Sequence, residues 1–219
     1  KHAAHFGILR GVKGRRLLQS ALVCNLPGGK PGESDLMEHD DVTTFFHEFG
    51  HLLHAMFATQ RWVDNSGTSV QHDFVEAPSQ LLEEWAAKPE VLQSFATDAK
   101  GAPIPRELVA KMKAASEYGK GLVVRQQMCY ARLSLNLYRT DPAHLDIDKM
   151  TKDIQNSYTP FPFVEGTHMA ASFGHLNGYS ANYYTYMWSL VIAKDMWSAF
   201  AGTNLLGSPT SMKYRKLVL

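Results

Sequence analysis

The sequence FFHEFGHLLHAMF at residues 45–57 places ionisable side chains inside an otherwise apolar run. Each residue of an α-helix advances about 100° around the helix axis, so His47, Glu48 and His51 share one side of a helix through this run. Neutral imidazoles four residues apart can both reach one tetrahedral zinc ion, and a glutamate between them lies beside the open coordination position. The pattern therefore predicts a metal site with His47 and His51 as ligands and Glu48 as general base.

A third protein ligand must complete such a site, and its position separates the known zinc classes. The metzincin class requires glycine at position 54 and histidine at position 57, where this chain has His54 and Phe57. Glu76 follows His51 by 25 residues, beyond one turn, on a helix predicted over residues 72–96. His54 also faces the metal side, but it lies far along the helix from the point where the two other histidines converge. We expect Glu76 to be the third ligand, with His54 as the alternative.

The hydrophobic pattern of the chain is mainly helical, with one short apolar run that is typical of a buried strand. Gly and Pro residues bound most of these segments. A Pro-rich segment at 158–166 is a point at which two lobes could divide, although we expect one catalytic core over residues 1–219. Strand is predicted at 15–26 and helix at 42–58, 72–96 with a break at Pro89, 106–119, 122–139, 147–157 and 180–201.

Smaller features concern the predicted helices around the site. The apolar residues opposite the histidines are expected to form a packing face, namely Phe45, Phe49, Leu52, Leu53, Met56 and Phe57. Gly50 costs about 1 kcal/mol relative to alanine inside a helix, so we expect a close neighbour there. Gln80 and Glu83 follow Glu76 by four and seven residues and could orient the ligands, but an exposed charged face is an equal alternative for Glu83.

Composition narrows the choice of partner. The 219 residues include 22 Lys and Arg against 21 Asp and Glu, for a net charge of +1, which does not favour nucleic acid or a membrane surface. No apolar run approaches the roughly 18 residues that span a bilayer, and no signal segment is evident, so we expect a cytoplasmic protein. Cys24 and Cys129 fit no ligand pair and are expected to be free buried thiols.

Three blocks of sequence carry a family resemblance: HEFGHLLH at 47–54, HDFVEAPSQLLEEW at 72–85 and SFGHLNGYSANYYTYMWS at 172–189. In this order they resemble the thimet oligopeptidase family of zinc peptidases, which includes oligopeptidase A and peptidyl-dipeptidases. The resemblance implies a mainly α, zincin-like catalytic core with a small β element near the active site. It also implies one zinc per chain, short peptide substrates, and an N-terminal helical lobe and C-terminal end that this chain lacks.

The third block contains a stripe of tyrosines. Tyr179, Tyr183 and Tyr186 have the spacing of one helical face, which on its own is more typical of a core or an interface. The resemblance assigns Tyr179 and Tyr186 to the bound substrate and the oxyanion, with His175 nearby, and leaves Tyr183 open. The segment HLNGYS has one residue and one glycine fewer before Tyr179 than the family pattern, so the loop could be stiffer.

The expected reaction is hydrolysis of a peptide bond by a zinc-coordinated water, with Glu48 as general base. The motif FVEAPSQ favours an endopeptidase that acts on short peptides. One alternative is a peptidyl-dipeptidase of the same family, which releases dipeptides from C-termini. The other is a zinc-binding fragment that is inactive without its missing lobe.

Overall fold

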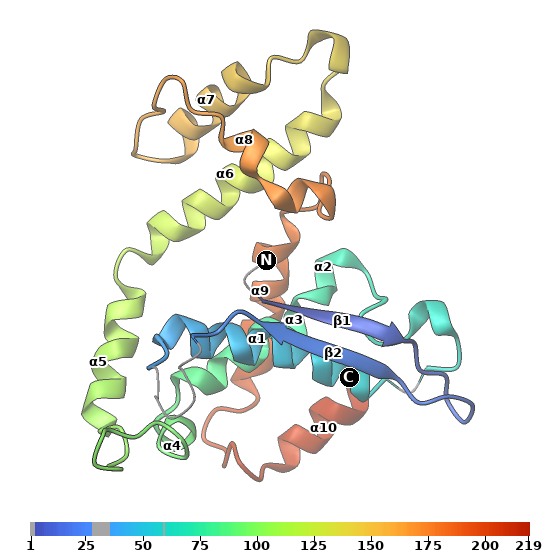
Figure 1. Ribbon diagram of the computed structural model, residues 1–219, viewed down its shortest axis with the longest axis vertical. Coiled ribbons are helices and arrows are strands. Elements are labelled where there is room, and N and C mark those ends of the chain that lie inside the picture. Colours follow the sequence, from blue (N-terminus) through green and yellow to red (C-terminus); the bar gives the residue numbers. More distant parts are fainter. Residues whose placement is uncertain (1–2, 28–35, 59) are drawn as a thin grey trace. The chain divides into compact units, whose positions relative to one another are not determined.

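The computed structural model describes residues 3–27, 36–58 and 60–219, and these form two compact units (Figure 1). The first unit comprises residues 1–113 and 189–219, and the second comprises residues 114–188. The chain passes from the first unit to the second within α5 (Arg106–Glu117) and returns within α9 (Thr185–Ser198). Segment 158–166 is therefore not the boundary. The secondary structure confirms a mainly α chain, whereas a single catalytic core over residues 1–219 stays a prediction.

A two-stranded antiparallel sheet supplies the small β element of the first unit. Strand β1 (Ala3–Leu9) pairs with β2 (Gln19–Cys24), so that His5 lies opposite Leu22. Strand β2 lies within the predicted run at 15–26, but the sequence analysis did not predict β1. Both strands contact helix α1 (His39–Met56), beside which they lie in Figure 1. The sheet is therefore adjacent to the helix that carries the HExxH motif.

Helix α1 confirms the helix predicted at 42–58 and begins slightly earlier. A capping box starts it, in which the Glu38 backbone N–H donates to the Asp41 carboxylate at 3.3 Å. The expected apolar packing face is only partly buried, because Phe45 and Met56 are 36% and 56% exposed. The fully buried positions of α1 are instead Gly50, His54 and Ala55. The helix packs on α3 (Ala77–Glu83), with Gly50 close to the backbone of Pro78 and Ser79.

The predicted helix at 72–96 is broken into short pieces. They are α2 (His72–Val75), α3, the 3-10 helix η2 (Glu84–Ala87) and α4 (Pro89–Leu92). Pro78 has no N–H to donate to the carbonyl of Phe74, so α2 cannot continue through it. Pro78 lies in the first turn of α3 and Pro89 begins α4, the positions that a helix tolerates. Glu76 is left at the junction between α2 and α3.

The hydrophobic core of the first unit joins α3 to the C-terminal part of the chain. Buried Leu81 packs with Ala193, Phe200 and Leu205, and the partly buried aromatic residues Trp85, Trp197 and Tyr214 cover this cluster. The core includes residues of α9 and is covered by α10 (Pro209–Leu217), a helix that the sequence analysis did not predict. The short 3-10 helix η1 (Val63–Asn65) follows α1 in the same unit.

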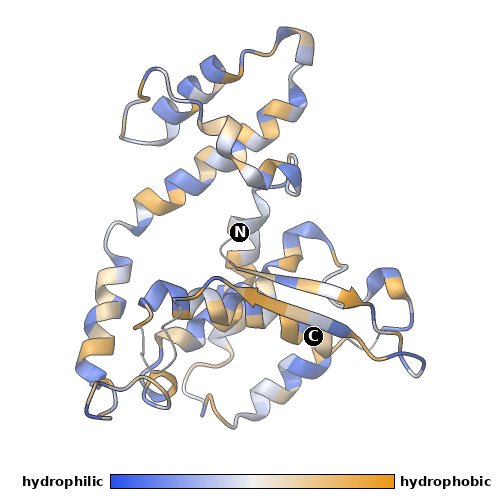
Figure 2. Ribbon diagram, in the orientation of Figure 1, coloured by the Kyte–Doolittle hydropathy of each residue, from blue (hydrophilic) through white to orange (hydrophobic). Residues whose placement is uncertain are grey.

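The second unit has its own core, formed by Cys129, Leu133 and Ile154. Its elements are α6 (Lys120–Arg139), η3 (Pro142–His144), α7 (Ile147–Tyr158), α8 (Met169–Ser172) and η4 (Gly174–Asn177). Helices α5, α6 and α7 match their predicted ranges within about two residues, the usual uncertainty of helix ends. Helix α9 begins at Thr185, later than the predicted residue 180. Figure 2 shows hydrophobic and hydrophilic residues interspersed along α5 and α6.

Two further expectations concern the thiols and membranes. Cys24 and Cys129 are both free; Cys129 is buried and Cys24 is only half-buried. No helix within the described ranges is long and apolar enough to cross a membrane.

Candidate metal centre

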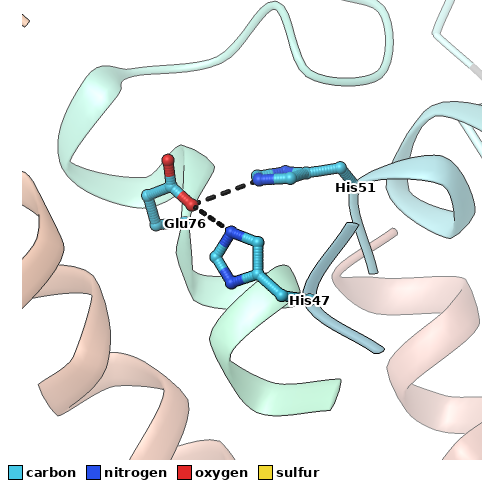
Figure 3. A group of neighbouring side chains, drawn as sticks. All are labelled: His47, His51 and Glu76. Atoms are coloured by element: carbon cyan, nitrogen blue, oxygen red, sulfur yellow. Dashed lines mark ion pairs between the residues drawn. The ribbon is translucent and has the colours of Figure 1, made fainter. Parts of the chain in front are cut away.

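Three side chains from two elements converge on one point in the first unit (Figure 3). The Nε2 atoms of His47 and His51 lie 3.2 and 3.1 Å from Oε2 of Glu76. The two imidazole rings are nearly perpendicular, with centroids 5.0 Å apart. Among the described residues this is the only cluster of three or more His, Cys, Asp or Glu side chains whose ligand atoms gather in this way. The structure therefore brings together the three residues that we expected as ligands.

The spacing of these atoms fits a zinc ion. Tetrahedral coordination with bonds of about 2.0–2.1 Å separates neighbouring ligand atoms by roughly 3.4 Å. The two measured N–O distances, 3.2 and 3.1 Å, are slightly shorter than this separation. Two imidazoles and one carboxylate also form a typical ligand set for catalytic zinc, which leaves a fourth position open.

Close packing between α1 and α3 places Glu76 beside the histidines. Glu76 is 2% exposed, and its carboxylate Oε2 accepts a hydrogen bond from the Ser79 hydroxyl at 3.0 Å. The same hydroxyl lies 2.9 Å from the Glu76 carbonyl oxygen. No role was predicted for Ser79 from the sequence. Its position three residues after the ligand, one helical turn away, was the signal that could have identified it.

The electrostatics of the cluster favour a positive charge at its centre. Burial alone would raise the pKa of Glu76, but hydrogen bonds from His47 and His51 outweigh burial and hold that pKa well below its usual range. Burial likewise opposes charge on His47, yet its bonds with Glu76 and Glu83 raise its pKa to about 10. A divalent cation would supply the same positive charge to these ligands.

Glu83 provides a second contact to one of the ligands. Its Oε1 lies 2.6 Å from Nδ1 of His47, the ring nitrogen that faces away from Glu76. Of the two expectations for Glu83, the contact with a ligand is the one that the structure shows. Gln80 is half-buried, and its orienting role stays a prediction.

Glu48 lies next to the cluster but is not part of it. Its Oε2 accepts a hydrogen bond from the backbone N–H of His5 on β1, at 2.8 Å. This bond ties the expected general base to the sheet, and it connects residues 43 positions apart in the sequence. The role of Glu48 as general base stays a prediction that this placement supports.

His54 is excluded from the ligand cluster by its position. It is 3% exposed and packs edge-on against Phe74, with ring centroids 6.3 Å apart. Burial, followed by the nearby His51 and His5, lowers its pKa to about 4. Its Nδ1 is buried without a hydrogen-bond partner among the described residues. The structure thus places Glu76, and not His54, against the two other histidines.

The tyrosines of the third block belong to the second unit, and the helical face expected for them is wrong. Tyr179 and Tyr183 precede α9, so only Tyr186 lies on a helix. A turn in which Ala181 has φ of 57° brings the rings together nonetheless. The Tyr186 ring lies 4.9 Å from that of Tyr179 and 5.0 Å from that of Tyr183, and 5.8 Å from that of His175. The expected roles of Tyr179, Tyr186 and His175 toward substrate stay predictions.

Comparison with known proteins identifies the family of this chain. Residues 1–219 match the model of Peptidase family M3. The chain is 34% identical over 203 residues to a dipeptidyl carboxypeptidase of Escherichia coli strain K12, an alignment that covers 90% of this chain and 30% of that protein. It is 32% identical over 207 residues to a thimet-like oligopeptidase of Dictyostelium discoideum, with 91% and 30% covered. Oligopeptidase A of the same E. coli strain is 32% identical over 205 residues, with 90% and 30% covered.

The chain thus spans about 30% of the length of these relatives. The family model nevertheless matches it from the first residue to the last, through all three sequence blocks and the ligand cluster. This chain therefore belongs to Peptidase family M3.

Proposed function

We propose that this chain is the zinc-dependent catalytic part of a peptidase that hydrolyses peptide bonds in short peptides. The observation that carries the proposal is the convergence of His47, His51 and Glu76, with Glu48 held beside them on α1. The names of the relatives, which are oligopeptidases and dipeptidyl carboxypeptidases, support the same reaction. One zinc ion per chain is the cofactor that the ligand set fits.

The residues of the chain have separate roles in this proposal. The chemistry supplied by zinc, when it is bound, is polarisation of the scissile carbonyl and acidification of a water molecule. Glu48 accepts a proton from the attacking water and returns it to the departing amine as the C–N bond breaks. Because Oε2 of Glu48 already accepts the His5 N–H, Oε1 is the oxygen expected to take this proton. The products are a carboxylate and an amine.

Release of dipeptides from C-termini is a second candidate function. Two of the relatives, at 34% and 32% identity, are named dipeptidyl carboxypeptidase. An endopeptidase cleaves a peptide whose C-terminal carboxylate is blocked as an amide. A dipeptidyl carboxypeptidase that must bind that carboxylate does not cleave the blocked peptide. Mass spectrometry of the products from a matched pair of free and amidated peptides distinguishes the two.

A third possibility is a zinc-binding chain that has no peptidase activity on its own. The relatives are much longer, so the chain alone could bind zinc without turning over peptide. Zinc in the purified chain, together with no cleavage of a quenched peptide, would favour this outcome.

Three further expectations stay predictions from the sequence. They are a cytoplasmic location, short peptides as partners in preference to nucleic acid or membranes, and a further N-terminal lobe.

The decisive test is Glu48→Gln, which removes the proton acceptor and keeps the shape of the side chain. We expect peptidase activity to fall to background while about one zinc per chain is retained. Glu90→Gln on α4 is the matched control, because it removes one carboxylate from the same unit outside the ligand cluster. Undiminished turnover in Glu48→Gln would refute the mechanism.

A further inference from the structure

The two histidines of the metal centre are held differently by the protein. His47 contacts Glu76 through Nε2 and Glu83 through Nδ1, at 3.2 and 2.6 Å. His51 contacts Glu76 through Nε2, and no described residue bonds its Nδ1. One imidazole is therefore fixed at both ring nitrogens, and the other at only one.

The contact with Glu83 determines which nitrogen of His47 is free to bind a metal. An ionised carboxylate can only accept a hydrogen bond, so Nδ1 of His47 must carry the proton. When the ring gives up its other proton, as metal binding requires, its lone pair is at Nε2, the atom that faces Glu76 and the point of convergence. The side chains of His47 and Glu83 are 20% and 33% exposed, so solvent competes only in part for this bond. At 2.6 Å the contact has the length of a strong, charge-assisted hydrogen bond.

Helix α3 joins this contact to the third ligand. Glu76 immediately precedes α3 and Glu83 is its last residue, and at about 100° per residue the two side chains lie on nearly the same face. One short helix thus presents both a ligand and a carboxylate that orients another ligand. Close backbone contact at Gly50 holds this helix against α1, so both carboxylates project from a backbone that packs directly on the helix of His47.

We propose that Glu83 is a positioning residue of the metal centre, which holds His47 in the tautomer and orientation that bind zinc. It acts through His47 and contacts neither metal nor substrate. This inference rests on the zinc site of the proposed function, and it assigns a role to a residue outside the HExxH motif and the third ligand.

Glu83→Ala tests the proposal through zinc affinity, measured by competition with a chromogenic chelator. We expect zinc to bind about 10–100-fold more weakly, the usual effect of removing such a partner of a metal ligand. Glu84→Ala is the matched control, because Glu84 is the next residue and pairs with Lys194 instead of a histidine. Its zinc affinity is expected to equal that of the unchanged chain. Glu83→Gln keeps an oxygen acceptor, so its zinc affinity is expected to lie between those of Glu83→Ala and Glu84→Ala.

A second measurement separates positioning from a general loss of structure. In the zinc-loaded protein, the bonded Nδ1–H of His47 should give a downfield imidazole proton signal by NMR. The signal should disappear in Glu83→Ala and persist in Glu84→Ala. If Glu83→Ala does not fold, Glu83→Gln keeps nearly the same side-chain volume, and the test is then its zinc affinity, which should fall below that of the unchanged chain because a neutral acceptor bonds His47 more weakly.

The outcomes separate this inference from the proposed function. If the unchanged chain binds no zinc, the proposed function fails. If the unchanged chain and Glu83→Ala bind zinc equally tightly, or the imidazole signal persists in the variant, only the role of Glu83 is overturned.

Discussion

The backbone of Ser79 lies so close to Gly50 that a Cβ added to Gly50 would stand 2.6 Å from the Ser79 Cα. The carbonyl oxygen of Pro78 would be 2.9 Å from the same Cβ. Gly50 lies between His47 and His51 on α1, and Ser79 donates to the Glu76 carboxylate. The absence of a side chain at Gly50 therefore sets how closely Glu76 approaches His47 and His51.

Gly50→Ala is expected to weaken both folding and zinc binding. Forcing a methyl group against fixed backbone costs about 1–3 kcal/mol, which exceeds or offsets the gain of about 1 kcal/mol from replacing glycine in a helix. Separation of α3 from α1 would also move Glu76 away from His47 and His51. Urea unfolding and chelator competition measure the two effects.

Gly121→Ala provides the control for the Gly50 prediction. Gly121 lies in α6, and a Cβ there would meet no atom within 4 Å. Alanine at this position should leave zinc affinity unchanged and stabilise the chain by up to about 1 kcal/mol. If Gly50→Ala behaves in the same way as Gly121→Ala, the close contact does not control the site.

Zinc is expected to stabilise the folded chain by mass action. A ligand that binds only the folded state at about 100 times its dissociation constant stabilises it by about 2.7 kcal/mol. Chelation should remove this increment, and Glu76→Gln should reduce it sharply because the variant lacks a charged ligand. Thermal unfolding at several zinc concentrations measures the effect. A midpoint that does not change with zinc would contradict the assignment of the three ligands.

The parts of the site that the sequence predicted are those encoded by local spacing. His47 and His51 are one helical turn apart, so their proximity follows as soon as α1 forms. Glu76 was predicted to be a ligand on a continuous helix, but Pro78 breaks that helix. The structure nevertheless places Glu76 beside His47 and His51, because the junction between α2 and α3 directs it toward α1.

The contacts that the sequence could not predict connect distant segments. The bond from the His5 N–H to Glu48 uses a backbone donor, which has no side-chain signature. The contact of Glu83 with His47 depends on how α3 packs against α1, so its sequence spacing left an exposed face equally plausible. Tyr179 and Tyr183 were expected on one helical face with Tyr186, whereas a turn at Ala181 brings them together. In each case the contact depends on backbone geometry that side-chain periodicity does not report.

His54 should make the stability of the chain depend on pH. Its pKa falls from 6.5 to about 4 on folding, because burial, then His51 and His5, disfavour its charged form. The unfolded chain therefore binds more protons than the folded chain between these two values. The contribution of neutral His54 to the free energy of unfolding is complete above pH 6.5 and is lost as the pH falls toward 4. From the size of the pKa shift, this lowers the free energy of unfolding by about 3 kcal/mol.

His54→Gln tests this dependence, since glutamine stays neutral across the whole range. We expect the fall in unfolding free energy between pH 6.5 and 4 to be smaller by about 3 kcal/mol in the variant. Urea unfolding of the zinc-free protein at a series of pH values measures the difference. The pKa of His5 is also lowered by burial and by His51, but His5 affects the free energy of unfolding equally in both proteins. If the free energies of unfolding of the two proteins change with pH in parallel, His54 does not titrate in this way.

Tyr186→Phe tests the role expected for the tyrosine cluster. If the Tyr186 hydroxyl donates to the oxyanion, its removal should lower kcat by about 10²–10³-fold, the usual effect of losing one such donor. Phenylalanine keeps the ring that packs against Tyr179 and His175, so folding and zinc content should be unchanged. Tyr184→Phe is the matched control, because Tyr184 lies two residues earlier and is 43% exposed. Steady-state kinetics on a quenched peptide compare the two variants. An equal loss in both variants, or full activity in Tyr186→Phe, would place the oxyanion donor elsewhere.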